Sequence, residues 1–359
     1  MGGIQNSSLL FKDKPVFGLD IGFSTVKVMQ IERSGKGKNS VVGYGVARFD
    51  GKAIKDGVIV DVEAIAKPIQ ELFKKGLVGH ISTRRVVVSV PATRTFAKTM
   101  SLPSLQDKEL KEAVLMEAQQ YIPMPIEQLY IDYSVIEKTK DSSEVLTVGV
   151  PREIVDSHLS LMQVLGLEAV AFETTTGAAG RLFENQHRSS EVPAVLIDFG
   201  SLSADITIHD KTIIVSSTAP CGGDIFTDLI AKKLGVSTEE GYIIKTKYGL
   251  GKSKKQKEIQ EAIGPELDNL VKEIKRMIRY YEERSESKKK IGQIVTMGGG
   301  ANMPGLSDYL TETLRLPVRM CDPWLELEIG KLKAPTEVEK AMYVIAAGLS
   351  FVDNKEIFS

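Results

Sequence analysis

The sequence predicts an α/β fold made of two related lobes that face one ligand. Three segments support this prediction: the hairpin 16–29, the hairpin 194–208 and the loop 298–300. In each, the turn or loop comes directly after an apolar strand. In both hairpins an apolar strand ends in Asp-x-Gly, a turn with Ser or Thr follows, and an alternating strand resumes. Because the two hairpins lie about half the chain apart, we interpret them as copies of one unit.

The residues of the two hairpins suit a phosphate and a magnesium ion. Asp20 and Asp198 end the two strands, and carboxylates hold Mg²⁺ while leaving much of its water shell in place. Gly22 and Gly200 let the backbone approach a ligand, and successive turn N–H groups form a concavity for phosphate oxygens. Further hydroxyl donors are expected from Ser24, Thr25, Ser201 and Ser203. The alternative is two ordinary hairpins with polar turns, in which Asp, Gly and Ser are common.

Composition and charge restrict the class of protein. A chain of 359 residues is too long to fold around one ordinary hydrophobic core, so two or more subdomains are expected. With 42% hydrophobic residues, 26% charged residues and a net charge of −1, the chain is typical of globular proteins and has no electrostatic attraction to nucleic acid. Its two cysteines and four histidines are scattered, which argues against a zinc site and fits a reducing compartment. Since it has neither a signal-peptide pattern nor an apolar run of about 18 residues, we expect a cytoplasmic protein without direct membrane insertion.

The first half of the chain divides into a lobe and an inserted unit. After a tail, residues 15–83 form the first lobe, with the first hairpin, a strand over Val41–Phe49 and a helix over Val62–Lys75. Residues 84–167 are expected to form a small inserted α+β unit, whose elements are a strand over 84–90, a helix capped by Ser104, strands over 130–137 and 145–150, and a helix over 154–165. Residues 168–192 return to the first lobe with a helix over Glu173–Glu184.

The second lobe is expected over residues 193–335. Gly222 and Gly223 open a helix, where exposed N–H groups and the positive end of the helix dipole favour an anion. An amphipathic helix over Pro265–Glu283 carries its proline in the first turn. The strand 291–297 runs into Gly298, Gly299 and Gly300, which can lie under a base or sugar or can simply make a flexible turn. A C-terminal helix within 336–353 is assigned to the first lobe.

Together these motifs resemble the actin-like ATPase superfamily. The segments DIGFSTVK, DFGSLSAD and MGGGANMPGL stand in the order of its two phosphate hairpins and its adenosine loop. Over about residues 16–351 the chain is similar to the PilM family of type IV pilus assembly proteins, itself similar to the division protein FtsA. Four segments carry this resemblance: VSVPATRTFAKTMSLP, EAQQYIPMPIEQLYIDY, GVPREIVDSHLSLMQVLGL and TAPCGGDIFTDLIAKKLG. The resemblance implies two lobes built on duplicated ribonuclease H-like domains.

The resemblance also implies ATP and Mg²⁺ as cofactors. Asp20 and Asp198 would flank the magnesium–nucleotide, and Glu173 would orient the attacking water, unless it only caps its helix. The nucleotide contacts carried over are, for the phosphates and sugar, Gly22–Thr25, Lys27, Gly200–Ser203, Gly222 and Gly223, and, for the adenosine, Lys245, Gly298, Gly299 and Gly300. Two residues depart from the pattern: Phe23 replaces a small polar residue, and Tyr242 stands where relatives often have a ribose-binding Glu. We therefore expect ATP binding rather than efficient hydrolysis.

For function, the resemblance implies an ATP-gated cytoplasmic adaptor of pilus assembly. Its partner would be the N-terminal cytoplasmic tail of a PilN-like inner-membrane protein, with the inserted unit forming part of the tail-binding groove. The adaptor would connect the membrane platform to the motor, and self-association is a further expectation. The alternatives are an FtsA-like filament anchored to membrane, a secretion-system homologue and a small-molecule kinase. The ending FVDNKEIFS is too short and acidic for an amphipathic anchor, and no Asp base for a kinase is identified.

Overall fold

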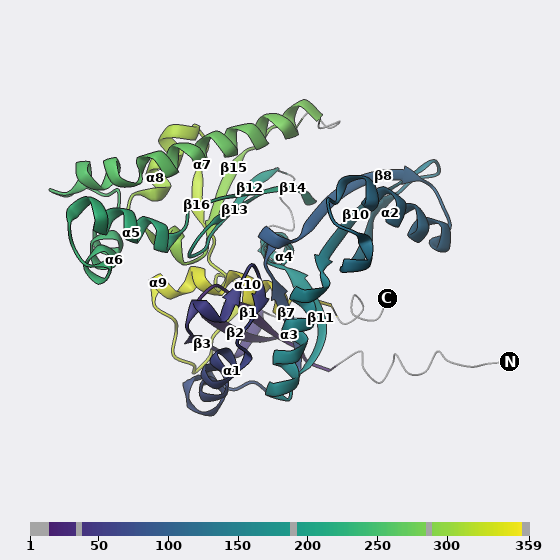
Figure 1. The fold of residues 1–359 in the computed structure, drawn as a ribbon, viewed down its shortest axis with the longest axis horizontal. Helices are drawn as coiled ribbons and strands as arrows, with labels where there is room; N and C mark the ends of the chain where they lie inside the picture. The colour runs from purple at the N-terminus through teal and green to yellow at the C-terminus, as the bar shows by residue number, and fades with distance from the viewer. Residues whose placement is uncertain (1–13, 34–37, 187–191, 285–288, 354–359) are drawn as a thin grey trace.

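The structure, a computed structural model, describes residues 14–33, 38–186, 192–284 and 289–353. Nearly all of the predicted N-terminal tail lies outside these residues. Within them, Figure 1 shows two β-sheets with helices around them and a smaller third sheet set to one side. The helices are α1 (Val62–Glu71), α2 (Asp107–Tyr121), α3 (Arg152–Leu165), α4 (Thr175–Gln186), α5 (Gly223–Leu234), α6 (Thr238–Lys247), α7 (Gln256–Arg284), α8 (Leu306–Leu314), α9 (Glu337–Lys340) and α10 (Val344–Ser350).

The two large sheets share one strand order. The first sheet contains β1 (Phe17–Ile21), β2 (Thr25–Glu32), β3 (Asn39–Arg48), β6 (Val78–Gly79), β7 (Arg85–Val90), β11 (Glu168–Thr174) and β17 (Leu327–Glu328). The second contains β12 (Ala194–Phe199), β13 (Ala204–Asp210), β14 (Thr212–Ala219), β15 (Gln293–Met297) and β16 (Val318–Met320). The order β11-β7-β1-β2-β3 matches β16-β15-β12-β13-β14, with the same parallel and antiparallel pairings. The predicted duplication is therefore present in the backbone.

A shared core between the two sheets holds the lobes together. The helices α4 and α10 lie in it, and apolar side chains of both sheets pack around them, namely Met29, Val87, Leu196, Val295 and Met297. Gly348 permits this contact, because a Cβ there would come within 2.0 Å of the Ala178 carbonyl oxygen on α4. The Ser350 hydroxyl accepts the Gly18 N–H at 3.2 Å and donates to the Met29 carbonyl at 2.7 Å. The predicted C-terminal helix thus packs on the first sheet and on α4.

Other helices cover the outer faces of the large sheets. Residues of α1 and α3 pack on the first sheet in a second core, with Ile65, Ile69 and Leu161 fully buried. Residues of α5, α7 and α8 form a third core against the second sheet. β1 and β12 are covered on both faces. Their residues are therefore almost all apolar up to the aspartate near the end of each strand.

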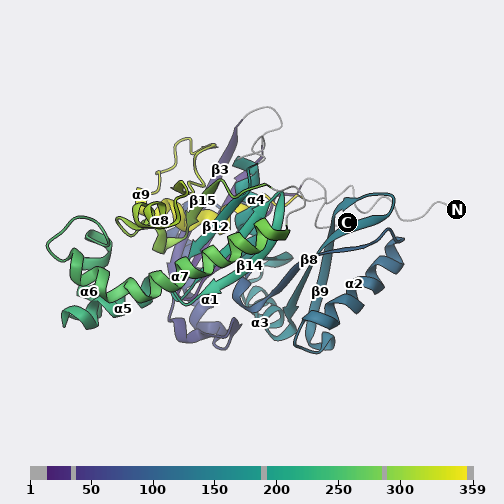
Figure 2. The same ribbon diagram turned by 90° about the horizontal axis from the view of Figure 1, so that it is seen from above.

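A smaller unit stands beside the first lobe. It is the three-stranded sheet β8 (Phe96–Pro103), β10 (Ser142–Pro151) and β9 (Leu129–Lys138), with α2 packed on it; β4 (Ile54–Lys55) and β5 (Val58–Ile59) pair separately. Figure 2 shows this unit extending away from the body of the molecule. Since β7 belongs to the first large sheet and α3 packs on α1, we propose bounds of 96–151 for the unit, in place of 84–167.

Three expected helix starts are wrong. Glu173 lies in strand β11, which ends at Thr174, and α4 begins at Thr175. The helix expected to begin at Pro265 begins at Gln256, because the apolar stripe continues backwards through fully buried residues Ile259 and Ile263. This burial offsets an interior proline, which costs about 3 kcal/mol. The helix expected to be capped by Ser104 instead begins with a capping box made by Gln106 and Glu109.

Candidate functional site

The turn between β1 and β2 brings a carboxylate, a hydroxyl and an ammonium group together. The Gly22 N–H donates to the Thr25 carbonyl at 2.9 Å and closes the turn. Asp20 lies opposite Lys27 in the strand register, and Nζ of Lys27 is 2.9 Å from Oδ2 of Asp20. A Cβ on Gly22 would lie 3.2 Å from Lys27 Nζ and 3.6 Å from Thr25 Oγ1. The glycine therefore leaves open the space beside both donor groups.

Ser89 on β7 positions the first of the two aspartates. Its hydroxyl donates to Oδ1 of Asp20 at 3.0 Å and accepts the Ile21 N–H, also at 3.0 Å. Ser89 is almost fully buried and was not among the predicted site residues. The signal was present, since a lone hydroxyl in the apolar strand 85–90 must find a hydrogen-bond partner once it is buried.

The turn between β12 and β13 repeats this arrangement with one change. The Gly200 N–H donates to the Ser203 carbonyl at 2.9 Å, as in the first turn. Asp198 lies opposite Asp205 in the strand register, so a second carboxylate stands where the first hairpin has a lysine. Thr218 Oγ1 donates to Oδ1 of Asp205 at 2.8 Å. Sequence reasoning missed Asp205, although its spacing from Asp198 equals that of the lysine in the first hairpin.

The carboxylates of both lobes influence one another. Burial raises the pKa of Asp198 to about 7, and the nearby Asp205 and Asp20 add to this shift while Lys27 opposes it. Burial also raises the pKa of Asp205 to about 6, against the hydrogen bond from Thr218. Asp20 and Lys27 of the first hairpin are thus among the charges that act on Asp198 of the second. Because charge interactions weaken with distance, we interpret the two hairpins as facing one space.

Asp20 and Asp198 fit a magnesium ion whose other oxygen ligands do not come from the protein. A divalent cation between Asp20 and Asp198 would relieve the repulsion that opposes ionisation of Asp198. In the described part of the chain, no group of three or more His, Cys, Asp or Glu side chains is arranged to hold a metal alone. The remaining ligands would be phosphate oxygens and water, which is usual for Mg²⁺.

Glycines pack two further loops against the second hairpin. The Gly223 N–H donates to the Gly200 carbonyl at 2.8 Å. A Cβ on Gly222 would lie 2.3 Å from the Ser201 carbonyl oxygen, and one on Gly300 would lie 2.9 Å from Cβ of Phe199. No larger residue fits at either position without a shift of the backbone. The structure thus brings 200–201, 222–223 and 298–300 together.

Gly298 and Gly299 differ in how well the structure would tolerate a side chain at each position. Gly298 has φ +80°, and a Cβ there would come within 2.2 Å of Oδ1 of Asp198. Gly298 is therefore required both by backbone conformation and by the aspartate beside it. Gly299 is exposed, and a Cβ there would make only ordinary contact with Met342 at 3.7 Å. Among the three glycines, Gly298 has the tightest surroundings.

Lys245 on α6 closes one side of this region. Its side chain is buried, and Nζ donates to the Gly223 carbonyl at 2.6 Å. Burial lowers the pKa of Lys245, while Asp224 and Asp228 oppose that shift. Nζ also lies 5.1 Å from the ring centre of Tyr242, which is itself about half exposed. Lys245 is therefore placed beside the glycine loop at Gly223.

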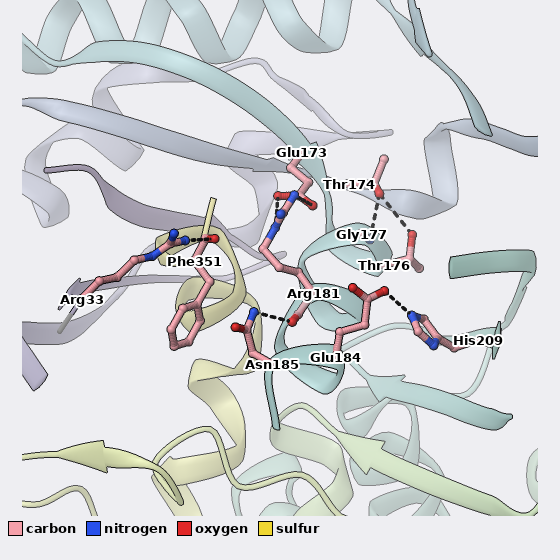
Figure 3. Close-up of polar contacts among 10 residues, drawn as sticks. All are labelled: Arg33, Glu173, Thr174, Thr176, Gly177, Arg181, Glu184, Asn185, His209 and Phe351. Atoms are coloured by element: carbon pink, nitrogen blue, oxygen red, sulfur yellow. Dashed lines mark hydrogen bonds and ion pairs between the residues drawn. The ribbon is translucent and has the colours of Figure 1, made fainter. Parts of the chain in front are cut away.

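Glu173 is engaged in an ion pair. It lies opposite Ser89 at the end of β11, and its Oε1 accepts from Nη2 of Arg181 on α4 at 3.0 Å (Figure 3). The helix N-terminus is capped by Thr174, whose hydroxyl accepts the Gly177 N–H at 3.0 Å. Thr174 therefore caps the helix, and Arg181 contacts both oxygens of the Glu173 carboxylate.

The first hairpin accommodates Phe23 by packing it away from the turn. A Cβ on Gly51 would lie 2.6 Å from the Phe23 ring, so the ring rests against the backbone of the turn after β3. The Ser24 carbonyl accepts the Phe49 N–H at 3.0 Å, which joins the two segments. Phe23 therefore contributes an aromatic contact outside the turn, but no hydroxyl donor to it.

The strand order and the paired hairpins define an actin-like ATPase fold. The family model for type IV pilus assembly protein PilM matches residues 18–353, and the chain belongs to this family. The solved PilM–PilN type IV pilus biogenesis complex is similar to it, with a TM-score of 0.82 and 21% identity over 94% of this chain and 98% of that one. The recognition of the family and the predicted fold class are thereby confirmed.

Other relatives agree with the fold. Cell division protein FtsA of Pseudomonas aeruginosa is 25% identical, and the match covers 87% of this chain and 84% of that protein. MreB 5 of Spiroplasma citri, solved with bound AMPPNP, has a TM-score of 0.52 and 14% identity over 97% of this chain and 96% of that one. Among the described residues, no helix is both long and apolar enough to span a membrane.

Proposed function

We propose that the protein is an ATP-binding adaptor that acts on the cytoplasmic side of the inner membrane in type IV pilus assembly. The observation that carries this proposal is the meeting of two matched Asp-x-Gly hairpins, one from each lobe, around one space. Membership of the PilM family supplies the cellular context. An actin-like relative, MreB 5, has been solved with AMPPNP, which supports nucleotide as the ligand class.

Each group of site residues has a role in this proposal. Asp20 and Asp198 hold Mg²⁺, which supplies positive charge to the phosphates when it is bound. Lys27 and the backbone of the two turns bind the phosphates, since N–H groups of such turns form anion sites. The sugar and adenosine contacts are assigned to Gly222, Gly223, Lys245, Gly298, Gly299 and Gly300. Closure of the two lobes on the nucleotide would then change the shape of the groove to which a partner binds.

We infer that binding, rather than rapid hydrolysis, is the working step. Glu173 is held by Arg181 in this conformation, which restrains the carboxylate that would orient water. The first turn also lacks the hydroxyl that Phe23 replaces. A bound ATP would therefore persist long enough to hold the closed form, with weak turnover at most.

The proposed partner is the N-terminal cytoplasmic tail of a PilN-like inner-membrane protein. A TM-score of 0.82 to PilM in a PilM–PilN complex supports this assignment. Through that tail the adaptor would connect the membrane platform to the motor. With a net charge of −1, the chain offers no reason to expect a nucleic-acid partner.

Calorimetry tests the proposal directly. Wild type, Asp20→Ala and Asp198→Ala are titrated with ATP and Mg²⁺, alone and after addition of a synthetic PilN-type tail. Wild type should bind ATP, both variants should lose it, and the tail should tighten ATP binding without turnover. Because coupling is reciprocal, ATP should tighten the tail by the same factor. ATP binding that is unchanged in both variants would contradict the site, and no effect of the tail would contradict the gating.

An FtsA-like filament is the second candidate, because FtsA proteins match most of the chain. It is tested by sedimentation and light scattering at rising protein concentration, with and without Mg–ATP. ATP-dependent pelleting without the tail would favour the filament, whereas a small, constant oligomer would favour the adaptor.

A further inference from the structure

An aromatic ring stands open to solvent beside the glycine loops of the second lobe. Tyr242 lies on α6 and is 47% exposed. Single exposed apolar groups are common on proteins and need no explanation by themselves. The position of this ring distinguishes it, because Nζ of Lys245 lies 5.1 Å from the centre of the ring and connects it to the candidate site.

A short series of contacts leads from the phosphate hairpin to this ring. The Gly223 N–H donates to the Gly200 carbonyl at 2.8 Å, and the Gly223 carbonyl accepts from Nζ of Lys245 at 2.6 Å. A Cβ on Gly223 would lie 3.4 Å from that Nζ and 3.8 Å from Cα of Gly300. Tyr242 is therefore placed at the end of the site to which we assigned the sugar and the base, rather than at the phosphate hairpin.

The backbone that carries the ring is held in place. Figures 1 and 2 show α6 beside α5, and a Cβ on Gly241 would lie 2.8 Å from both Cβ of Ala231 and the Thr227 carbonyl oxygen on α5. The two helices therefore pack with almost no space between them at this point. Thr246 Oγ1 donates to the Tyr242 carbonyl at 2.9 Å. A ring fixed in this way loses little conformational freedom when a ligand binds to it.

The ring offers a ligand a face rather than a hydrogen-bonding edge. The ammonium of Lys245 lies over one face of the ring, as in a cation–π contact, and the exposed part of the ring is left for a ligand. The other residues assigned to the sugar and adenosine are glycines, apart from Lys245, which donates to the Gly223 carbonyl. Stacking on an aromatic ring tolerates different bases, because every base has a π-face.

We propose that the nucleobase stacks on the open face of Tyr242, so that the site binds adenine and guanine nucleotides with little preference between them. This inference rests on the proposed nucleotide site and adds to it a second ligand, GTP, and the residue that determines base selectivity. Lys245 is a positioning residue, because it contacts the other face of the ring and holds the Gly223 loop. The Tyr242 hydroxyl has no part in the stack.

The test compares three ligands by calorimetry on the full chain with Mg²⁺: ATP, GTP and inorganic triphosphate. Wild type should bind ATP and GTP with affinities within about fivefold of each other. Tyr242→Ala should weaken both by about five- to hundredfold, as expected for the loss of one base–aromatic stack, and should leave triphosphate binding unchanged. Tyr242→Phe should bind all three as wild type does, because it keeps the ring.

Tyr280→Ala on α7 is the matched control. Tyr280 is 44% exposed and, like Tyr242, has a cation over its ring, since Cζ of Arg284 lies 4.3 Å from the ring centre. This substitution should leave the affinity for all three ligands unchanged. Circular dichroism of each variant verifies that it is folded.

Fluorescence shows whether the base touches this position. The chain has one tryptophan, the buried Trp324, so Tyr242→Trp adds a single exposed indole. ATP and GTP should quench the added fluorescence by stacking, triphosphate should not, and the emission of wild type should stay constant.

The outcomes separate this inference from the nucleotide site itself. If wild type binds neither nucleotides nor triphosphate, the proposed function fails and this inference fails with it. If wild type binds ATP, the inference alone is overturned by any of three results: unchanged affinity in Tyr242→Ala, a preference between ATP and GTP above about fivefold, or no quenching in Tyr242→Trp. A loss in Tyr242→Phe as large as that in Tyr242→Ala would also overturn it, because the hydroxyl would then be the binding group.

Discussion

Asp198 and Asp205 lie directly opposite each other on β12 and β13, at the positions that Asp20 and Lys27 occupy on β1 and β2. The first pair is an ion pair at 2.9 Å, whereas the second consists of two like charges with raised pKa values. The duplicated backbone therefore carries a neutralised carboxylate in one lobe and an unneutralised pair in the other. A cation bound between the lobes would neutralise the charge of the second pair.

The pKa of Asp198 predicts a pH dependence for Mg–ATP binding. A protonated carboxyl is a poor Mg²⁺ ligand, and burial raises the pKa of Asp198 to about 7. Affinity should therefore fall as pH drops from 8 to 6, by up to about tenfold per pH unit below this pKa. In Asp205→Asn, which removes a like charge, the fall should shift to lower pH. Calorimetry at several pH values measures the Mg–ATP affinity of wild type and of Asp205→Asn. A wild-type affinity that does not change with pH would contradict the role of Asp198.

The same raised pKa predicts how stability changes with pH. Folded Asp198 holds its proton more tightly than unfolded Asp198, whose pKa is near 3.8. The free energy of unfolding should therefore fall as pH rises from about 4 to 7 and stay low above that window. Asp198→Asn should remove this loss and be more stable than wild type at pH 8 by about 1–3 kcal/mol, allowing for partial exposure. Denaturant melts at pH 5 and 8 measure this difference in stability, with Asp132→Asn on the exposed face of β9 as the matched substitution.

Ser89→Ala should destabilise the protein and weaken nucleotide binding together. The change leaves the Ile21 N–H without its acceptor and removes a donor from Asp20. The expected loss is about 1–3 kcal/mol in the free energy of unfolding, because both partners are buried. Ser134→Ala on the exposed part of β9 is the control and should stay within about 0.5 kcal/mol of wild type. Equal stability of the two variants would mean that the Ser89 hydroxyl does not hold Asp20.

Gly298→Ala should disrupt the site through its backbone. The residue has φ +80°, and the new Cβ would come within 2.2 Å of Oδ1 of Asp198. We expect a loss of more than about 1 kcal/mol in stability and no measurable ATP binding. Gly264→Ala is the control in α7, because no atom beyond its chain neighbours lies within 4 Å of the new Cβ, and it should leave ATP binding unchanged. Normal ATP binding by Gly298→Ala would remove this loop from the site.

Arg181→Gln should raise the slow hydrolysis of bound ATP if Glu173 can orient water once it is released. The guanidinium now contacts Oε1 at 3.0 Å and Oε2 at 3.4 Å, so its removal takes away this ion pair. Single-turnover assays should show a severalfold faster rate in Arg181→Gln. The double variant Glu173→Gln with Arg181→Gln should lose that gain. A rate that is unchanged in the single variant, or faster in both, would contradict a role for Glu173.

Much of the site could be predicted because its residues are local in sequence. The paired Asp-x-Gly turns, Gly222 and Gly223 at a helix start, and Gly298–Gly300 after a strand all carry their chemistry within a few residues. Ser89 and Asp205 were missed because their roles depend on strand pairing across the sheet. The ion pair of Glu173 was missed because it depends on where β11 ends and α4 begins.

The sequence by itself determined the two lobes, their matched hairpins and the aspartates near the ends of the first strands, since apolar runs and turn residues specify strands and hairpins locally. Only the tertiary structure decided which charges meet. It set Lys27 against Asp20 but Asp205 against Asp198, and held Glu173 on Arg181. Electrostatic and hydrogen-bonding partners are chosen by distance in space and by burial, which a linear pattern does not contain.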